Sequence, residues 1–120
     1  MTKKEIAIAF LELVGKGVVK AAYERFVSKS FIHHNQYFEG SRAGLLKAME
    51  DAENTHPNTA LEVKHCYEDG DTVITHTLVV KADMELVVIH IFKFHDSKIT
   101  ELWDVGQVID PNSPNQYGLF

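Results

Sequence analysis

The sequence predicts an α+β fold in which three N-terminal helices pack on a curved antiparallel sheet. Apolar residues recur at helical spacing in three segments before residue 55, and from residue 60 they occupy every second position. Two strongly apolar runs, 86–94 and 99–108, are separated by a short polar turn, which is typical of a β-hairpin. A chain of 120 residues with 45% hydrophobic content is expected to form one domain, 1–120, with its own core.

Three amphipathic helices are expected in the first half of the chain. The first, over 2–15, begins at a capping box in which the side chains of Thr2 and Glu5 each bond the other residue's backbone N–H. A shorter helix is expected over 18–27, packed against the first, and a third over 41–54. Each presents a stripe of apolar side chains that must face the sheet or a neighbouring helix.

Four strands are expected in the second half. They are the runs 61–67, 73–80, 86–94 and 99–108. The last two are joined by Asp96-Ser97, which suits a two-residue hairpin turn, so they should pair antiparallel. Residues 31–35, ahead of the third helix, are expected to form a short extended segment that leaves the core.

Charge and cysteine content narrow the classes of function. The formal net charge is −5 and the twelve Lys and Arg residues are scattered, whereas nucleic acids and membrane surfaces require clustered positive charge. Cys66 is the only cysteine, so no intrachain disulfide can form. The chain has no charged-then-apolar leader and no apolar run of membrane length, which predicts a cytoplasmic protein.

The sequence also predicts a homodimer. The run 86–94 is apolar on both faces, and only one face can cover the helices. The other would be an exposed apolar patch unless a second subunit covered it. The C-terminal segment 109–120 should be irregular, with its last residues, Leu119 and Phe120, docked on the domain or on a second subunit.

Two polar residues interrupt the apolar hairpin. His90 lies within one run, and Asp104 follows Trp103 in the other. A polar group placed there needs a partner or a cavity. In the simpler interpretation, His90 is satisfied within the core and Asp104 bonds the backbone. The seven histidines of the chain, several of them inside apolar patterns, favour instead a pocket with proton-transfer or ligand-binding chemistry.

Whether His90 and Asp104 share a face depends on the register of the hairpin. With a two-residue turn at Asp96-Ser97 and a regular ladder, His90 lies opposite Trp103, and Asp104 points to the other face. A β-bulge between Lys98 and Trp103 would bring Asp104 to the side of His90. Bulges are common in curved sheets and beside active sites, and we predict one here.

His33 and His34 are adjacent in an extended segment, so their side chains face opposite ways. At most one of them enters a given cavity. In the simpler interpretation, one caps a helix or bonds the backbone while the other is solvated. His34 is followed by Asn35, and this pair belongs to a longer pattern that is known from other proteins.

The pair His34-Asn35 after the second helix, with a closing pattern of the type V-x-D-I-F-R-x-x-x-G-K-I-x-E-H-W-D that ends at Trp103-Asp104, resembles the SnoaL-like proteins of the nuclear transport factor 2-like superfamily. The resemblance covers essentially the whole chain. Two positions depart from the pattern. His90 stands where the family has Asp before Ile-Phe-Arg, and Leu102 stands where it has His before Trp-Asp, so the proton arrangement of the typical member does not carry over unchanged.

The resemblance implies a cone-shaped, cystatin-like fold whose helices and curved sheet enclose a deep apolar cavity, often in a homodimer. In the superfamily, such cavities perform polyketide cyclisation by intramolecular aldol condensation, ketosteroid isomerisation or epoxide hydrolysis, without a required metal or cofactor. These reactions share a buried acid or base that acts on a small organic molecule. The fold alone does not choose among them.

The leading hypothesis is a SnoaL-like lyase or isomerase that acts, without a cofactor, on a small hydrophobic or carbonyl-containing molecule. Asp104 would take a proton alpha to a carbonyl, while His34 and His90 donate hydrogen bonds to the developing enolate. An apolar cavity favours this division because it strengthens hydrogen bonds to an oxyanion. Further ligand contacts are expected from Asn35, His76, Trp103, Phe10, Phe92 and Leu102.

Two alternatives remain open. The cone could bind a hydrophobic metabolite without catalysis, as a dimeric module, and the departures at His90 and Leu102 favour this interpretation. The other alternative is a metal site built from His34, His76, His90 and Asp104. No spacing such as H-x-H or H-E-x-x-H supports a metal, and we predict none.

Overall fold

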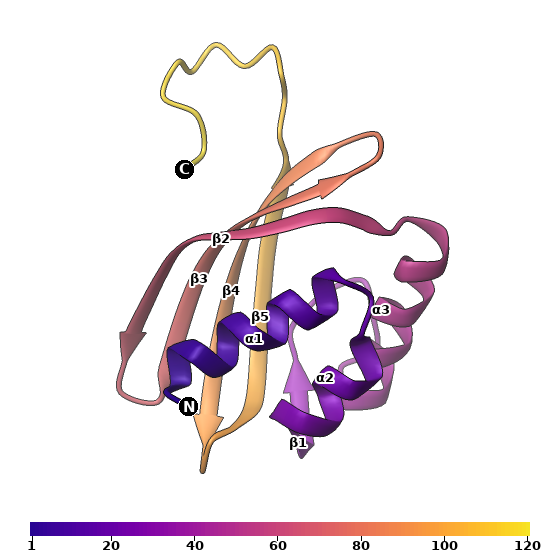
Figure 1. The fold of residues 1–120 in the computed structure, drawn as a ribbon, viewed down its shortest axis with the longest axis vertical. Coiled ribbons are helices and arrows are strands. Elements are labelled where there is room, and N and C mark those ends of the chain that lie inside the picture. The colour runs from indigo at the N-terminus through magenta and orange to yellow at the C-terminus, as the bar shows by residue number, and fades with distance from the viewer.

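The computed structural model describes the whole chain, 1–120, as three helices packed on one face of a five-stranded sheet (Figure 1). The helices are α1 (Lys3–Gly15), α2 (Val19–Phe26) and α3 (Arg42–Thr55), and the strands are β1 (Val27–His33), β2 (Asn58–Asp69), β3 (Thr72–Lys81), β4 (Glu85–His95) and β5 (Lys98–Val108). The strand order is β1-β5-β4-β3-β2. No helix is both long and apolar enough to cross a membrane.

The helices form where the local sequence signals predict them. The capping box at the start of α1 is present, with Thr2 Oγ1 accepting from the Glu5 N–H at 3.1 Å and Glu5 Oε1 accepting from the Thr2 N–H at 2.9 Å. The predicted bounds of all three helices differ from the observed bounds by at most one residue. These signals are local because a cap involves groups only three residues apart.

The sheet is mixed, which corrects the prediction of a purely antiparallel sheet. Residues 27–33 form β1, which pairs parallel with β5 at Val27 with Ile99 and at His33 with Leu102. The segment predicted to leave the core therefore begins inside the sheet. Local periodicity could not reveal this strand, because its backbone partners lie about seventy positions away along the chain. Its buried residues, Val27, Phe31 and His33, also do not follow a regular alternation over the whole strand.

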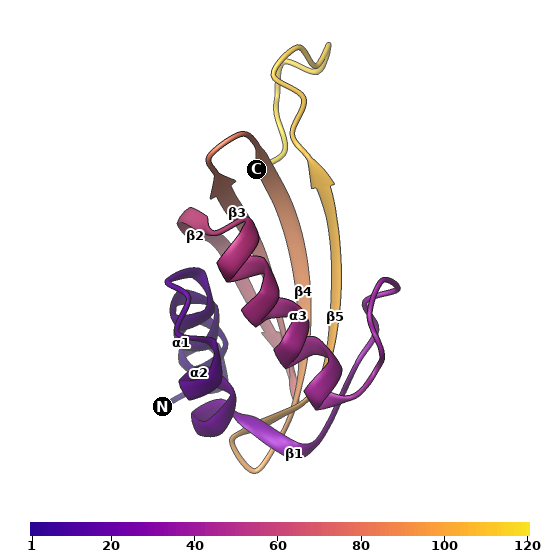
Figure 2. The same cartoon turned by 90° about the vertical axis from the view of Figure 1, so that its right-hand side faces the viewer.

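The helices lie over one face of the sheet, as the side view shows (Figure 2). The core lies between these two layers. The Phe10 ring of α1 packs against Tyr23 of α2 at 5.6 Å and against Phe92 of β4 at 6.1 Å, measured between ring centroids. Phe92 pairs with Leu102 on β5, and both are buried. These residues identify the helix-facing side of the sheet, called the inner face below.

The β4–β5 hairpin has the turn and the bulge that the sequence predicts. Asp96 and Ser97 have φ angles of 47° and 65°, as a two-residue turn of the primed type requires. On leaving the turn, Phe94 pairs with Ile99 but the preceding residue of β4 pairs two positions further along β5, so Thr100 has no partner opposite it. This bulge shifts every later residue of β5 by one position relative to β4.

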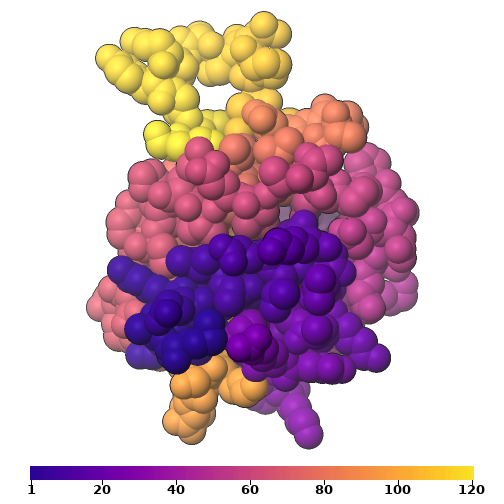
Figure 3. All heavy atoms as spheres, in the orientation of Figure 1, coloured from indigo at the N-terminus to yellow at the C-terminus, as the bar shows by residue number.

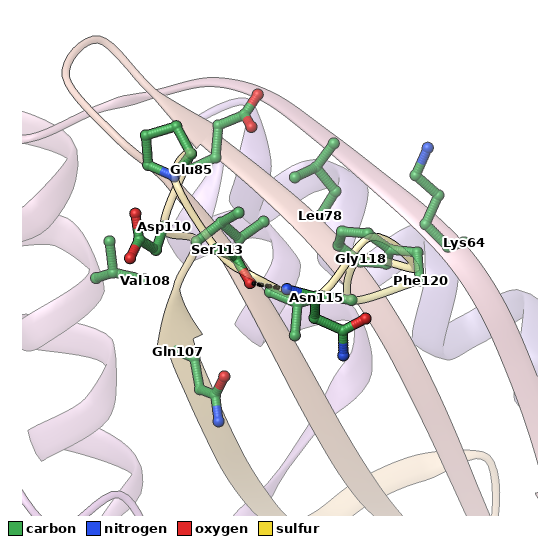
Figure 4. Close-up of a pocket in the computed structure, with 13 residues that line it drawn as sticks. Lys64, Leu78, Glu85, Gln107, Val108, Asp110, Ser113, Asn115, Gly118 and Phe120 are labelled. Carbon is green, nitrogen blue, oxygen red and sulfur yellow. Dashed lines mark hydrogen bonds between the residues drawn. The ribbon is translucent and has the colours of Figure 1, made fainter.

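The C-terminal segment 109–120 is irregular and projects beyond the body of the molecule before it returns (Figure 3). Its last ring, Phe120, stacks on His76 at 5.0 Å and lies 5.7 Å from Lys64 Nζ. The end of the chain thus lies against the face of the sheet opposite the helices, beside Lys64 and Leu78 (Figure 4). Docking of the terminal residues on the domain is confirmed.

Truncation after Pro114 is expected to lower the free energy of unfolding by about 1–2 kcal/mol. The reason is that Leu119 and Phe120 are 38% and 42% exposed, so each buries more than half of its apolar surface. Thermal melting of the two proteins measures the loss. Tyr117→Ser is the control, since that side chain is 83% exposed and its removal should leave the melting temperature unchanged. Equal melting of the truncated and full-length chains would show that the segment adds no stability.

Candidate functional site

Asp104 and His90 lie side by side on the inner face of the sheet. The bulge at Thr100 places them directly opposite each other in the β4–β5 ladder. They are two positions from the buried Phe92 and Leu102, and residues two apart in a strand share a face. The predicted bulge therefore brings the acid and the imidazole to one side.

The Asp104 carboxylate has one held oxygen and one free oxygen. Oδ2 accepts a hydrogen bond from Asn35 Nδ2 at 3.1 Å, and Asn35 Oδ1 in turn accepts from the Tyr37 backbone N–H at 2.9 Å. Oδ1 is buried and has no hydrogen-bond partner. Because Asn35 is itself anchored to the backbone, it fixes the direction of the carboxylate, and the free oxygen can accept a proton.

His90 is neutral at neutral pH. Its side chain is 8% exposed, its ring lies 5.7 Å from the ring of Phe92, and its Nδ1 is buried without a partner. Burial lowers the pKa of His90 from 6.5 to about 4, and the neighbouring Asp104 carboxylate only partly opposes this effect. A neutral imidazole carries one N–H, so His90 can donate one hydrogen bond to a ligand.

The two adjacent histidines face opposite ways, and neither points at Asp104. His33 is buried, and its Nδ1 accepts from the Asn35 N–H at 3.1 Å while its Nε2 donates to the Glu39 carbonyl at 2.6 Å. This is the simpler interpretation, in which one histidine bonds the backbone. The His34 ring stacks on Trp103 at 4.5 Å, and its Nε2 lies 2.6 Å from Glu101 Oε2.

A pocket of about 660 Å³ opens beside Asp104, between the loop 34–37 and strands β4 and β5. Its wall includes Asp104 and Asn35, together with Val88 and Gly106 one step nearer the end of the sheet. His34 also lines it. The volume is in the range of small-molecule sites, which are concave, largely apolar and equipped with a few polar groups.

Five of the expected ligand contacts lie elsewhere. His76 and Trp103 are on the outer face of the sheet, since their paired positions fall between those of the inner residues. Phe10, Phe92 and Leu102 are at most 1% exposed and pack in the core, and none of them lines the pocket. His76 and Asp104 lie on opposite faces of the sheet. No three His, Cys, Asp or Glu side chains lie close enough together to hold a metal ion. The metal site considered for His34, His76, His90 and Asp104 is therefore not formed.

Two inner-face residues were not predicted as site residues. Thr75 and Thr77 are fully buried on β3, and the hydroxyl oxygen of each lacks a hydrogen-bond partner. Alternation along β3 shows that they share one face and His76 the other, but it does not show which face meets the helices. Knowledge that the face with Thr75 and Thr77 meets the helices would have identified them as candidate site residues.

Tyr23 of α2 is a further polar group near the site. Its hydroxyl donates to Met49 Sδ at 3.2 Å, and the Arg42 guanidinium lies 5.5 Å from its ring. Burial raises the pKa of Tyr23, Arg42 lowers it in part, and the Asp104 charge raises it further. The phenol therefore stays protonated and can act only as a hydrogen-bond donor or neutral acceptor.

Comparison with solved structures shows the fold. AclR, a proposed hydroxylase from Streptomyces galilaeus, matches with a TM-score of 0.75 at 20% identity over 88% of this chain and 78% of its own. An NTF2-like protein of unknown function from Burkholderia xenovorans matches with a TM-score of 0.74 at 14% identity over 96% and 88%. A proposed ketosteroid isomerase from Kribbella flavida matches with a TM-score of 0.74 at 13% identity over 95% and 84%.

No family model and no curated protein matches the sequence. The likeness is therefore one of structure. The α+β fold, with three helices on a mixed five-stranded sheet, matches that of solved structures described as nuclear transport factor 2-like (NTF2-like) proteins.

Proposed function

We propose that this NTF2-like fold serves a small-molecule lyase or isomerase of the SnoaL-like type, in which Asp104 is the general base. The observation that carries the proposal is the buried Oδ1 of Asp104, which has no hydrogen-bond partner and lies beside a neutral His90. Asp104 is also one of the residues that line the 660 Å³ pocket. A carboxylate with one oxygen oriented and the other without a partner is arranged to take a proton.

The reaction supported by this arrangement is proton abstraction alpha to a carbonyl. The α C–H bond breaks, its proton passes to Asp104 Oδ1, and its electron pair forms the C=C bond of an enolate whose charge rests on oxygen. The N–H of His90 donates to that oxygen, and Asn35 keeps Oδ2 in place during the transfer. Return of the proton from Asp104 to a different carbon completes an isomerisation. In the aldol reaction, the enolate carbon instead attacks a second carbonyl, the C=O π bond breaks to give an alkoxide, and the alkoxide takes the proton back from Asp104.

The structural neighbours support an enzyme of this general kind without selecting its reaction. Two of the matching proteins are proposed to be a hydroxylase and a ketosteroid isomerase. At 13–20% identity these activities belong to those proteins, and only the site can argue for this chain.

Exchange of α-protons tests the proposal without knowledge of the natural substrate. The ketone 4-phenyl-2-butanone is incubated with the protein in D₂O near neutral pD, and loss of the α-proton signals is followed by NMR. We expect exchange above the rate in buffer, in proportion to protein concentration. Exchange no faster than in buffer, for a ketone that binds, would leave a binding module as the function.

One observation favours that second function, a non-catalytic small-molecule-binding module. His34, one of the two donors expected for the enolate, is engaged by Glu101 and Trp103. His90 would then be the only histidine left to donate a hydrogen bond to the enolate oxygen. Binding of the ketone without α-proton exchange is the result that this alternative predicts.

We also propose a homodimer formed through the outer face of the sheet, which no helix covers (Figure 2). Apolar side chains on this face remain open to solvent, among them Val105 at 68% and Tyr67 at 59% exposure. Exposed apolar patches of this kind mark association surfaces.

Val105→Lys is expected to convert the dimer to a monomer, because a charge would be buried at the interface. Light scattering at micromolar concentration measures the mass. Ala43→Lys, an equally charged change at an exposed position of α3, should leave the dimer intact. A wild-type protein that is monomeric under these conditions would contradict the dimer.

A further inference from the structure

Four buried polar atoms without partners lie on adjacent strands of the inner face. They are the hydroxyl oxygens of Thr75 and Thr77, Nδ1 of His90 and Oδ1 of Asp104. Thr75 pairs with His90, and His90 pairs with Asp104, so three of the four form one row across β3, β4 and β5. The proposed proton transfer uses the β4 and β5 members of this row and leaves the two threonines unexplained.

The threonine hydroxyls gain nothing from the fold itself. Nearly all buried hydroxyls in proteins have a hydrogen-bond partner, and one without a partner is destabilising. Valine fills the same volume as threonine without that cost, and the next inner residues of β3 on either side, Val73 and Val79, are in fact valines. Thr75 and Thr77 therefore form a polar island of two side chains in an otherwise apolar strand face.

The island lies next to the pocket. Thr77 pairs with Val88, which pairs with Gly106, and both of these residues line the 660 Å³ pocket. Thr75 lies two strands from Asp104, and strands are about 4.8 Å apart, so the two positions are roughly 10 Å apart along the row. Neither threonine lines the pocket, and both are fully buried. A ligand whose carbonyl meets Asp104 therefore reaches them only when the side chains over β4 move and extend the pocket toward β3.

We infer that Thr75 and Thr77 form a second polar subsite, which receives a hydroxyl or carbonyl oxygen at the far end of an elongated, otherwise apolar ligand. This inference rests on the proposed function for the position of the ligand's first carbonyl. Each hydroxyl can both donate and accept, so the subsite accommodates either an alcohol or a ketone oxygen. The subsite sets specificity, whereas Asp104 and His90 perform the chemistry.

A matched pair of ketones tests the subsite. The compound 4-(4-hydroxyphenyl)-2-butanone carries a hydroxyl at the end remote from its ketone, and 4-phenyl-2-butanone lacks it. We expect the wild-type protein to bind the hydroxylated ketone about tenfold more tightly, the size of one hydrogen bond. NMR titration gives both dissociation constants. Equal affinity for the two ketones, or binding of neither, overturns the subsite.

Variants at the two threonines locate the preference. The double change Thr75→Val and Thr77→Val should abolish the tenfold preference while the melting temperature stays equal or rises, because only unpartnered hydroxyls are removed. The double change Thr75→Ser and Thr77→Ser keeps the hydroxyls and should keep the preference. A preference that survives in the valine variant overturns the assignment.

The same ketones separate this inference from the proposed function. In Asp104→Asn, α-proton exchange should fall while the preference for the hydroxylated ketone remains. A protein that shows the preference but never exchanges protons contradicts the general base and supports the subsite. A protein that exchanges protons but binds both ketones equally contradicts the subsite alone.

Discussion

Asp104→Asn is expected to lower the rate of α-proton exchange by about 10²–10⁴-fold, the contribution of a general base. Asparagine has the shape of aspartate, and its carbonyl oxygen can accept the hydrogen bond that Asn35 now gives to Oδ2. Its NH₂ group then occupies the place of the free Oδ1. An amide nitrogen in that position cannot take a proton. The substitution therefore removes the base and leaves the packing around residue 104 unchanged.

The measurement is the exchange rate in D₂O beside a melting curve for each variant. Asp83→Asn is the matched control, because it makes the same change at a carboxylate whose side chain is 61% exposed, in the turn between β3 and β4. The control should exchange like the wild type. Full activity in Asp104→Asn, with wild-type stability, would remove Asp104 from the mechanism.

The free energy of unfolding is expected to fall by roughly 3 kcal/mol between pH 6.5 and pH 4 because of His90 alone. The folded pKa of about 4 lies below the ordinary value of 6.5. Above pH 6.5 the imidazole is neutral in both states and has no effect. As the pH falls below 6.5, the unfolded chain binds a proton that the folded chain does not, so stability is lost until the folded pKa is reached.

His90→Gln should remove this contribution, since glutamine does not titrate. Urea unfolding at pH 7, 5.5 and 4.5 gives the free energy of unfolding of each protein as a function of pH. The contribution of His90 is the difference between the slopes of the wild type and the variant, because the other titrating groups contribute equally to both. His95→Gln, at an exposed histidine of the same hairpin, should retain the wild-type slope. Equal slopes in His90→Gln and the wild type would show that burial does not suppress the charge of His90.

Much of the local structure could be predicted from neighbouring residues. The capping box at Thr2 and Glu5 and the turn at Asp96-Ser97 follow from groups within a few positions of each other. Alternation along a strand likewise groups side chains by face. The bulge before Trp103 was predicted on more general grounds, because it brings Asp104 to the side of His90 and because bulges are common in curved sheets and beside active sites.

The position of β1 and the roles of the histidines could not be predicted in the same way. The parallel pairing of Val27 with Ile99 joins segments far apart in the sequence. His33 and His34 are equivalent by sequence, and the contacts with Glu39 on one side and with Glu101 on the other separate them. Such contacts depend on how distant elements pack, and local propensity carries no information about them.

By itself, the sequence determined which side chains share a face of each strand, because the side-chain period of two is a property of the extended backbone. Alternation separated the threonines of β3 from His76. It did not by itself place Asp104 with His90, because that required the bulge predicted between Lys98 and Trp103. Only the tertiary structure decided which of the two faces meets the helices, because that choice depends on where α1, α2 and α3 pack. The same packing buries Thr75 and leaves apolar side chains of the outer face exposed. The candidate site therefore depends on the tertiary structure as well as on the alternation of side chains.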